Sequence, residues 1–308
     1  MVLKPHVKVR NPVSRTWQIA RVGPKEMVHL LKDAGIAWNT DSAASMGAAI
    51  AFYTIFSIAP LLIITMAIAG FFFGADAAQG QIYSQARSLL GEDGATALQG
   101  LVQSASQPAE GFLATFVGLL FMLFGATGVF TELQGAMDRI WQTPVKEYQA
   151  GIWYLLRRRI LTFGILLAVA FLLLVSLTIS AFISALQSLW ITRSDELEMA
   201  WQAINFAVSF VIITGLFALL FKLLPRVSVA WGDVIIGAVF TALLFNFGKY
   251  LIGLYIGKTG VVSGFGAAGT VIAMVLWVYY SAQIFLLGAE FTWLYAQRFG
   301  SRKDTTES

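Results

Sequence analysis

The stretch from residue 268 to residue 297 decides the fold, and it reads AGTVIAMVLWVYYSAQIFLLGAEFTWLYAQ. Its only charged side chain is Glu290. A helix needs about 20 mostly apolar residues to cross the hydrocarbon core of a bilayer, and this stretch is long enough. It lacks the apolar–polar alternation of a strand in a membrane barrel. The stretch therefore predicts a transmembrane helix.

Five further apolar stretches have a comparable length and lie at about 45–73, 112–131, 160–190, 203–224 and 234–256. The whole chain is 57% hydrophobic and only 12% charged, with a mean hydropathy of +0.72. Soluble domains carry about 25% charged residues. We therefore predict an all-α polytopic membrane protein, with six transmembrane helices in one membrane domain over residues 42–298.

The basic residues indicate how these spans are oriented. Of the 21 Lys and Arg residues, 17 fall in the N-terminal tail, the 132–159 connection, the fourth-to-fifth connection and the C-terminal tail. The alternate connections hold only Arg87, Arg193 and Lys258. Because Lys and Arg are enriched in cytoplasmic loops, this alternation supports six spans and predicts that both termini lie in the cytoplasm. We expect no signal peptide, since residues 1–41 are basic and contain no apolar core.

Three parts lie outside the predicted spans. Residues 1–41 form a basic tail in which Pro24 and the helical spacing of Met27, Leu30, Leu31, Ala34 and Trp38 predict a helix over 24–40. That helix lies in the cytoplasmic interface or packs on cytoplasmic loops. Residues 75–111 predict a small outer cap of two short helices separated by Gly91–Gly94, acting as a gate or as a structural lid. Residues 299–308 are a cytoplasmic tail.

Two ionisable residues lie inside predicted spans, where charged groups are costly and often functional. Lys249 belongs to the outer half of the fifth span, where it faces a wet cavity and an anionic substrate or extends its stem to the interface. Glu290 lies near the cytoplasmic end of the sixth span. It binds a cation or takes part in proton coupling, or it forms a structural ion pair with an arginine such as Arg139 or Arg157. A direct pair with Lys249 is not expected because the two lie at different depths.

Other polar residues are candidates for packing or function. Asn205, Asn246 and Gln283 lie within spans, where such side chains commonly bond across helices. A second group lies near cytoplasmic span ends and consists of Asp41, Glu132, Asp138 and Arg139. We expect Asp41 to cap the start of the first span.

Ser57 and Pro60 form a candidate hinge in the first span, because a proline removes a backbone donor and kinks a helix. Ala44, Ala48 and Ala51 define a predicted close-packing face beside it. Gly253 and Gly257 have a spacing that permits close helix approach, in a homo-oligomer or within one subunit.

Several functional classes find no support in the sequence. The chain has no cysteine and only two histidines, His6 and His29, so no metal-binding spacing occurs. It contains no aromatic-interleaved basic stretch of a nucleic-acid module. We expect no cofactor, no metal, no nucleic-acid partner and no enzymatic activity.

Three motifs resemble the YihY/BrkB family of bacterial inner-membrane proteins over about residues 35–300. The first is Asp41 followed by AAIAFY at 48–53 with Ser57 and Pro60. The others are LQGAMDRIW at 133–141 and WVYYSAQIFLLGAE at 277–290. The resemblance implies six spans and a bacterial cytoplasmic membrane location, and it implies no settled activity. Members are often labelled ribonuclease BN, but the chain lacks the His-rich metal cluster of a metal-dependent nuclease.

These features favour a transporter, exporter or lipid-handling protein for an anionic or amphiphilic substrate. The alternative is a non-transporting scaffold or envelope-integrity protein, whose buried polar residues only hold helices together.

Overall fold

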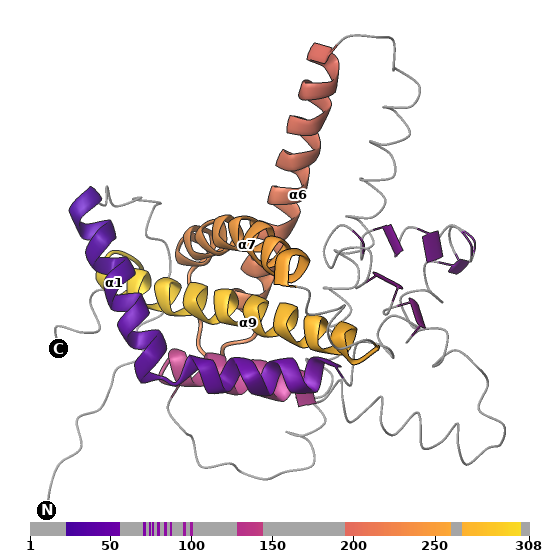
Figure 1. Cartoon of the computed structure of the whole chain (residues 1–308). Coiled ribbons are helices and arrows are strands. Elements are labelled where there is room, and N and C mark those ends of the chain that lie inside the picture. The colour runs from indigo at the N-terminus through magenta and orange to yellow at the C-terminus, as the bar shows by residue number, and fades with distance from the viewer. Residues whose placement is uncertain are drawn as a thin grey trace, which may run out of the picture.

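The computed structural model describes residues 23–55, 128–143, 195–259 and 267–302, together with residues 70, 71, 74, 76, 79, 80, 83, 84, 87, 95, 96, 99 and 100 (Figure 1). Its labelled helices are α1 (Pro24–Thr40), α6 (Asp195–Leu223), α7 (Trp231–Thr259) and α9 (Ala267–Arg298). Two more helices cover Ala43–Ile55 and 128–140. Every regular element in this described part of the chain is helical, which confirms the all-α prediction there.

Three of the described helices are long and apolar enough to cross a membrane, at Phe206–Leu223, Trp231–Ile252 and Val271–Arg298. These confirm the predicted helices at 203–224, 234–256 and 268–297. The helix α6 begins before the predicted span, at Asp195, because a polar first turn precedes its apolar part. The predicted span at 160–190 lies outside the described residues, as do most of 112–131 and residues 56–69 of the first span.

The second predicted span ends later than expected. Its helix continues past residue 131 to residue 140. Ala136, Met137 and Ile140 recur at helical spacing and are buried, so they keep one apolar face on the core after the hydrophobic stretch has ended.

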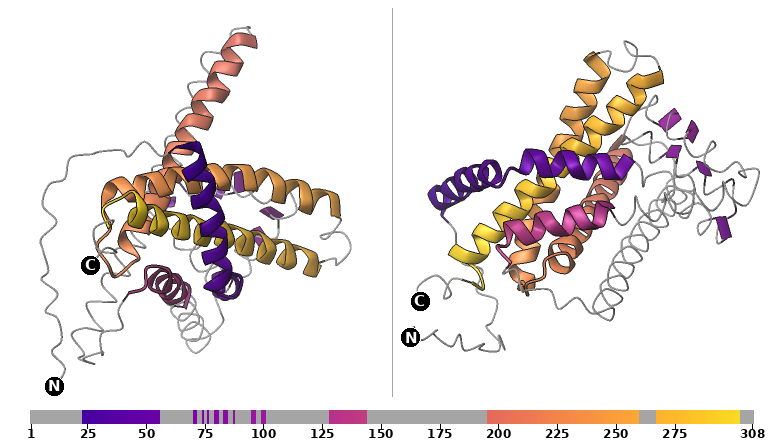
Figure 2. Two further views of the ribbon diagram at one scale, coloured as in Figure 1. Left: turned by 90° about the vertical axis from the view of Figure 1, so that its left-hand side faces the viewer. Right: turned by 90° about the horizontal axis from the view of Figure 1, so that it is seen from below.

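The helix α9 is the centre of the described bundle, with α1 and α7 packed on it and α6 packed on α7 (Figure 2). Its contact with α7 is a reciprocal pair of glycine–threonine contacts. A Cβ at Gly237 of α7 would collide with Thr292 of α9, and a Cβ at Gly288 of α9 would collide with Thr241 of α7. Because Gly237 and Gly288 have no side chain, the backbones of α7 and α9 approach closely, as they do at small residues in other membrane helices.

Each threonine hydroxyl in this contact is satisfied within its own helix. The Thr241 hydroxyl donates to the Gly237 carbonyl at 2.7 Å, and the Thr292 hydroxyl donates to the Gly288 carbonyl at 2.6 Å. Neither threonine thus leaves an unpaired hydroxyl in the buried α7–α9 contact.

The helix α1 has the predicted bounds and packs along α9. The Glu26 carboxylate accepts a hydrogen bond from the Gly23 N–H at 2.9 Å, which satisfies a free donor at the helix start. Leu30 and Ala34 are buried against Phe291 and Tyr295 of α9. The interfacial position predicted for this helix remains a prediction.

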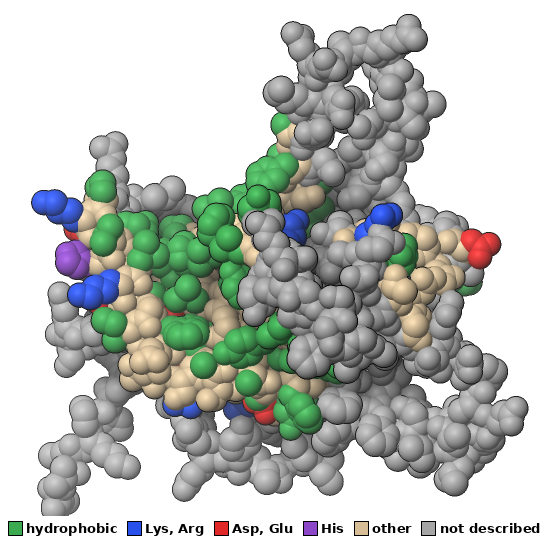
Figure 3. Space-filling view, in the orientation of Figure 1, with side chains coloured by type: hydrophobic (Ala, Val, Ile, Leu, Met, Phe, Trp, Pro, Cys, Tyr) green, Lys and Arg blue, Asp and Glu red, His purple; other side chains and the backbone are tan. Residues whose placement is uncertain are grey.

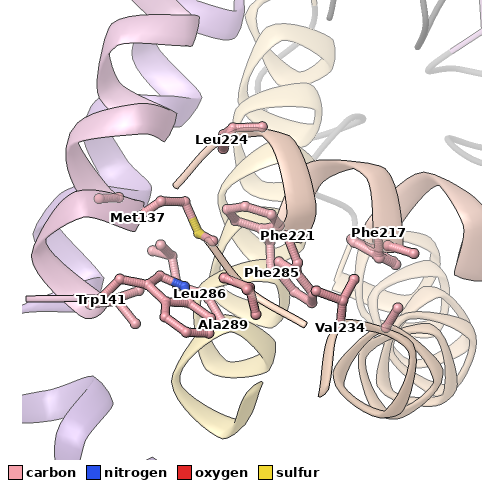
Figure 4. Packing of buried hydrophobic residues seen from close by; sticks show 14 of the residues in the cluster. Met137, Trp141, Phe217, Phe221, Leu224, Val234, Phe285, Leu286 and Ala289 are labelled. Carbon is pink, nitrogen blue, oxygen red and sulfur yellow. The ribbon is translucent and has the colours of Figure 1, made fainter. Parts of the chain in front are cut away.

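The main hydrophobic core lies where several helix ends meet (Figure 4). Met137 and Trp141 come from the 128–141 segment, Phe221 from α6 and Leu286 from α9. This core includes Ala43, Trp141, Leu224 and Val229 from the turns at 40–43, 141–143 and 224–230. Arg302 of the turn at 298–302 lies over the Trp141 ring and donates to the Ser228 carbonyl. We call these four turns together the basic end, and its cytoplasmic orientation stays a prediction.

Large apolar side chains are also exposed on the spans. Val211 is 67% exposed on α6, and Phe247 and Tyr250 are 63% and 65% exposed on α7. Hydrophobic side chains cover much of the coloured surface in Figure 3, and a group of Lys or Arg side chains and a histidine project at its left-hand edge, with a few more basic side chains near the centre and the lower rim. This distribution fits a molecule surrounded by lipid rather than by water.

The predicted close-packing face of the first span is confirmed at Ala51 and wrong at Ala44 and Ala48. Ala44 and Ala48 are exposed, whereas Ala43, Gly47, Ile50 and Ala51 are buried. The sequence contains small residues on both faces, so their size alone did not indicate which face meets α9.

In the predicted outer cap, the described residues at 76–87 and 95–100 have helical conformation, and Ala95 is buried. Gly91–Gly94 lie outside the described residues. The assignment of 75–111 to a cap stays a prediction.

Candidate functional site

Glu290 is the most unusual polar residue in the described spans. It lies in Val271–Arg298, eight residues before the end of α9 and hence about 12 Å along the helix from that end. Its side chain is 1% exposed. Neither carboxylate oxygen has a hydrogen-bond partner within the described part of the chain.

The neighbours of Glu290 differ from the expected ion pair. Arg139 is exposed, and no ion pair joins it to Glu290 in the described residues. Arg157 lies outside those residues. The charged group that acts on Glu290 is instead the carboxyl of Asp41, so an acid faces an acid.

Asp41 lies in the turn between α1 and the Ala43–Ile55 helix, which we call the elbow (Thr40–Ala43). Its backbone N–H donates to the Ala37 carbonyl at 2.8 Å and ends α1. The next helix starts from Ser42, whose carbonyl accepts hydrogen bonds from Ser45 and Met46. Asp41 therefore ends one helix rather than capping the other, and Ser42 has a left-handed φ of 59°, which is uncommon for a residue other than glycine.

Gln283 ties α9 to the first span, as expected for an amide that bonds across helices. Its Nε2 donates to the Ala43 carbonyl at 3.4 Å and lies against Gly47. Its Oε1 is buried and has no partner among the described residues. Gln283 and Glu290 are two turns apart on α9, so one face of this helix presents both groups toward the elbow and the first span.

Asp138 joins two turns of the basic end. Its carboxylate pairs with Nε of Arg226 at 3.0 Å and accepts the Arg226 backbone N–H at 3.3 Å. It also accepts the Thr143 hydroxyl at 3.4 Å. The structure thus connects Asp138 with Arg226, a pair separated by a long stretch of sequence.

The C-terminal turn is held by Asp233 at the start of α7. This buried carboxylate accepts the Ser301 N–H at 3.1 Å and the Ser301 hydroxyl at 2.7 Å. Nearby, the Arg302 guanidinium lies 5.5 Å from the ring centre of Trp141. Burial lowers the pKa of Arg302, and Asp233 opposes this change by stabilising the positive charge.

Lys249 does not belong to the Glu290 site. Its side chain is half-buried, and neighbouring Gly248 packs against Tyr280 and Ile284 of α9. Glu290 lies six residues beyond Ile284, about 9 Å further along α9. The two charged residues are therefore at different depths, as predicted.

The remaining candidates have different positions. The Asn246 amide donates to the Ala242 carbonyl of its own helix at 2.8 Å, so this bond is not between helices. Glu132 is half-buried. Asn205 lies in α6, but its side chain is outside the described part, and Ser57 and Pro60 lie outside the described residues altogether.

Sequence reasoning missed Asp233, Thr241 and Thr292. The Gly-x-x-x-Thr spacing at 237–241 and at 288–292 is visible in the sequence, but only packing shows that the two motifs face each other. Within the described part, no three His, Cys, Asp or Glu side chains converge as a metal site would require.

The apolar helices and their lipid-facing side chains define an α-helical integral membrane protein. Residues 37–308 match the family described as Virulence factor BrkB, and the chain belongs to that family. It is 28% identical to a UPF0761 membrane protein of Pseudomonas aeruginosa over 81% of its own length and 58% of the relative's. A UPF0761 membrane protein of Stenotrophomonas maltophilia is also 28% identical, over 81% of this chain and 56% of the relative.

A third UPF0761 membrane protein, from Rhodospirillum centenum, is 26% identical over 83% of this chain and 54% of the relative. The chain thus spans somewhat more than half the length of these curated relatives. No solved structure matches it.

Proposed function

We propose that this chain is a non-enzymatic transporter, exporter or lipid-handling protein that acts on an anionic or amphiphilic substrate. The observation that supports this proposal most strongly is Glu290, which is buried in a transmembrane helix and has no hydrogen-bond partner among the described residues. A charged side chain at the middle of a bilayer costs about 2.5 to 3.5 kcal/mol on insertion scales. A purely structural acid would be expected to have a basic or hydrogen-bonding partner.

The substrate class follows from a positive charge. Lys249 supplies a cation inside a span. An anionic head group would be attracted to this ammonium group, and an apolar tail would tolerate the exposed hydrophobic surface of α6 and α7. The proposal requires neither a cofactor nor a nucleic-acid partner.

The proposed location is the bacterial cytoplasmic membrane, with the basic end and both termini on the cytoplasmic side. The Lys and Arg distribution supports this orientation. In that orientation Glu290 lies in the cytoplasmic half of the bilayer and Lys249 lies in the outer half.

The test uses the absence of cysteine from the natural chain. Single cysteines replace Lys249, Gln283 and Glu290, and a small membrane-impermeant thiol reagent is applied from each side of the membrane. A transport pathway predicts labelling at these buried positions, because water must reach them. The matched control is Tyr250→Cys, which neighbours Lys249 but is 65% exposed on the lipid-facing side and should stay unlabelled.

Protection of all three positions in variants that fold normally would contradict a water-accessible pathway. The scaffold would then be the better explanation. The Gly–Thr contacts of α7 and α9 and the Gln283–Ala43 hydrogen bond would be its main structural features, since each fixes one helix against another.

A further inference from the structure

Trp38 and Ala43, which flank Asp41 in the chain, pack in the core that contains Ala289 of α9, and Asp41 is the charged group that acts on the buried Glu290. Within the described part of the chain, no ion pair joins either carboxyl to a Lys or Arg side chain. Of the nearby acids, Asp33 pairs with Arg298 and Asp138 with Arg226. Asp233 accepts two hydrogen bonds from Ser301. The other charged or titratable side chains that the structure describes on these elements are exposed or half-buried, apart from the buried Tyr295. They are Lys25, Glu26, His29, Lys32, Tyr53, Glu132, Arg139, Lys249, Tyr250, Tyr279 and Tyr280. Within this described part, Asp41 is the acid that acts on Glu290.

The surroundings of Glu290 are apolar. The preceding residues Leu286 and Ala289 belong to the main core, and the following residue Phe291 belongs to the core beneath α1. Two adjacent carboxylates cannot both keep their charge in such a place without a neutralising cation. A hydrogen bond between two carboxyl groups also needs a proton, because ionised carboxylates are only acceptors.

Other buried polar atoms near this core are also unpaired. The indole N–H groups of Trp38 and Trp141 have no acceptor among the described residues. Both rings pack against the core that contains Ala289. Trp141 is only 2% exposed. Buried donors and acceptors normally find partners or ordered water, and a small polar occupant beside Glu290 would supply such a partner.

We propose that Glu290 and Asp41 form a proton-binding site, with one proton held between the two carboxyl groups beneath the elbow. This inference rests on the proposed transport function, because it names the coupling ion of the same site. When the proton is bound, the pair has one negative charge and a hydrogen bond connects α9 to the elbow. When the proton leaves, two negative charges repel each other and push the elbow away from α9.

The experiment uses the apolar reagent dicyclohexylcarbodiimide on the full chain in lipid nanodiscs. A protonated carboxyl adds across a C=N bond of the reagent and rearranges to a stable N-acylurea, so the carboxyl gains the whole mass of the reagent and no other reactant is needed. Peptide mass spectrometry then identifies the modified residue. We expect an adduct on Glu290 at neutral pH and its loss at alkaline pH.

Three comparisons make the result specific. Asp233 is the internal control, because it is 5% exposed but hydrogen-bonded as a carboxylate and should remain unmodified. Glu290→Gln should abolish the adduct. Asp41→Asn should lower the yield on Glu290 at neutral pH several-fold, because the repulsion that favours the bound proton is gone.

Absence of an adduct on Glu290 at every pH, while the reagent modifies an added control carboxyl in the same nanodiscs, would overturn the proposal. Loss of the adduct when Na⁺ replaces K⁺ at constant ionic strength would overturn it too, since Na⁺ would then be the bound ion. An unchanged yield in folded Asp41→Asn protein would contradict the shared site. The thiol-labelling test reports water access separately, so a labelled pathway without the adduct would reject this inference alone.

Discussion

At the residue scale, Asp138 shows how one side chain joins distant turns. It contacts Arg226 through the side chain and the backbone, and it also accepts the Thr143 hydroxyl. Both members of the ion pair are partly exposed, at 29% for Arg226 and 18% for Asp138. Since an exposed ion pair alone contributes about 0 to 1 kcal/mol, most of the effect should come from the hydrogen bonds.

Asp138→Ala should therefore lower the free energy of unfolding by about 2 kcal/mol, because it leaves the Arg226 backbone N–H without its acceptor. Asp138→Asn should have a smaller effect because it keeps a side-chain acceptor. Denaturant titration in detergent micelles measures both changes. Arg139→Ala is the control, since the Arg139 side chain is exposed and its loss should change stability by less than about 0.5 kcal/mol. Equal losses in Asp138→Ala and Arg139→Ala would refute the assignment.

At the element scale, the α7–α9 contact depends on two glycines. Gly288→Ala places a methyl group against Thr241, and overpacking of this kind costs about 1 to 3 kcal/mol. Gly215→Ala in α6 is the matched control, because nothing lies within 4 Å of its added Cβ. That control should be stabilising by up to about 1 kcal/mol, because alanine is the better helix former.

Thermal unfolding in nanodiscs distinguishes the two glycine variants by the sign of the change. Adding Thr241→Ala to Gly288→Ala should recover part of the stability, since it removes the hydroxyl and methyl groups that collide. If Gly288→Ala and Gly215→Ala behave alike, α7 and α9 do not approach as closely as described.

The helix α1 gives a second prediction at this scale. Leu30 and Ala34 are buried on α9, whereas Val28 is 65% and Ile36 is 55% exposed. Lys25 and Lys32 lie on the same exposed face as these apolar residues, and a face that combines apolar and basic side chains is typical of a helix in the membrane interface. A fluorophore on Val28→Cys should be quenched by lipid-attached quenchers, and one on His29→Cys, which is exposed about 100° further around the helix, should be quenched more by water-soluble iodide. Equal access of iodide to both positions would place the helix in water instead.

At the scale of the whole molecule, the turns of the basic end should all face one compartment. Ser42, Gln142, Ser228 and Ser301 are exposed in these turns and can each be replaced by cysteine. An impermeant thiol reagent should label all four from the cytoplasmic side, and Asp76→Cys from the opposite side, because the Lys and Arg distribution predicts this orientation. Labelling of the four positions from different sides would contradict the six-span topology.

Local pattern was sufficient for much of the fold. Apolar length predicted the helices of the last three spans, since a helix that crosses lipid must be long and uncharged. Pro24 and helical spacing predicted the bounds of α1. The sequence pattern did not predict the end of the helix at residue 140, because that helix continues to pack on the core after its hydrophobic stretch has ended. It also did not predict the buried face of the first span, because small residues such as Ala43 and Ala44 occur on both faces.

The sequence by itself determined that this chain is a helical membrane protein, and it singled out Glu290 because an acid in an apolar stretch is conspicuous. Only the tertiary structure decided what that acid faces. An arginine partner was a reasonable expectation from composition, but among the described residues the charged group that acts on Glu290 is Asp41 of the elbow. The physical reason is that hydrophobicity and charge are counted over neighbouring residues in the sequence. The environment of a buried carboxyl depends instead on which distant segments pack around it.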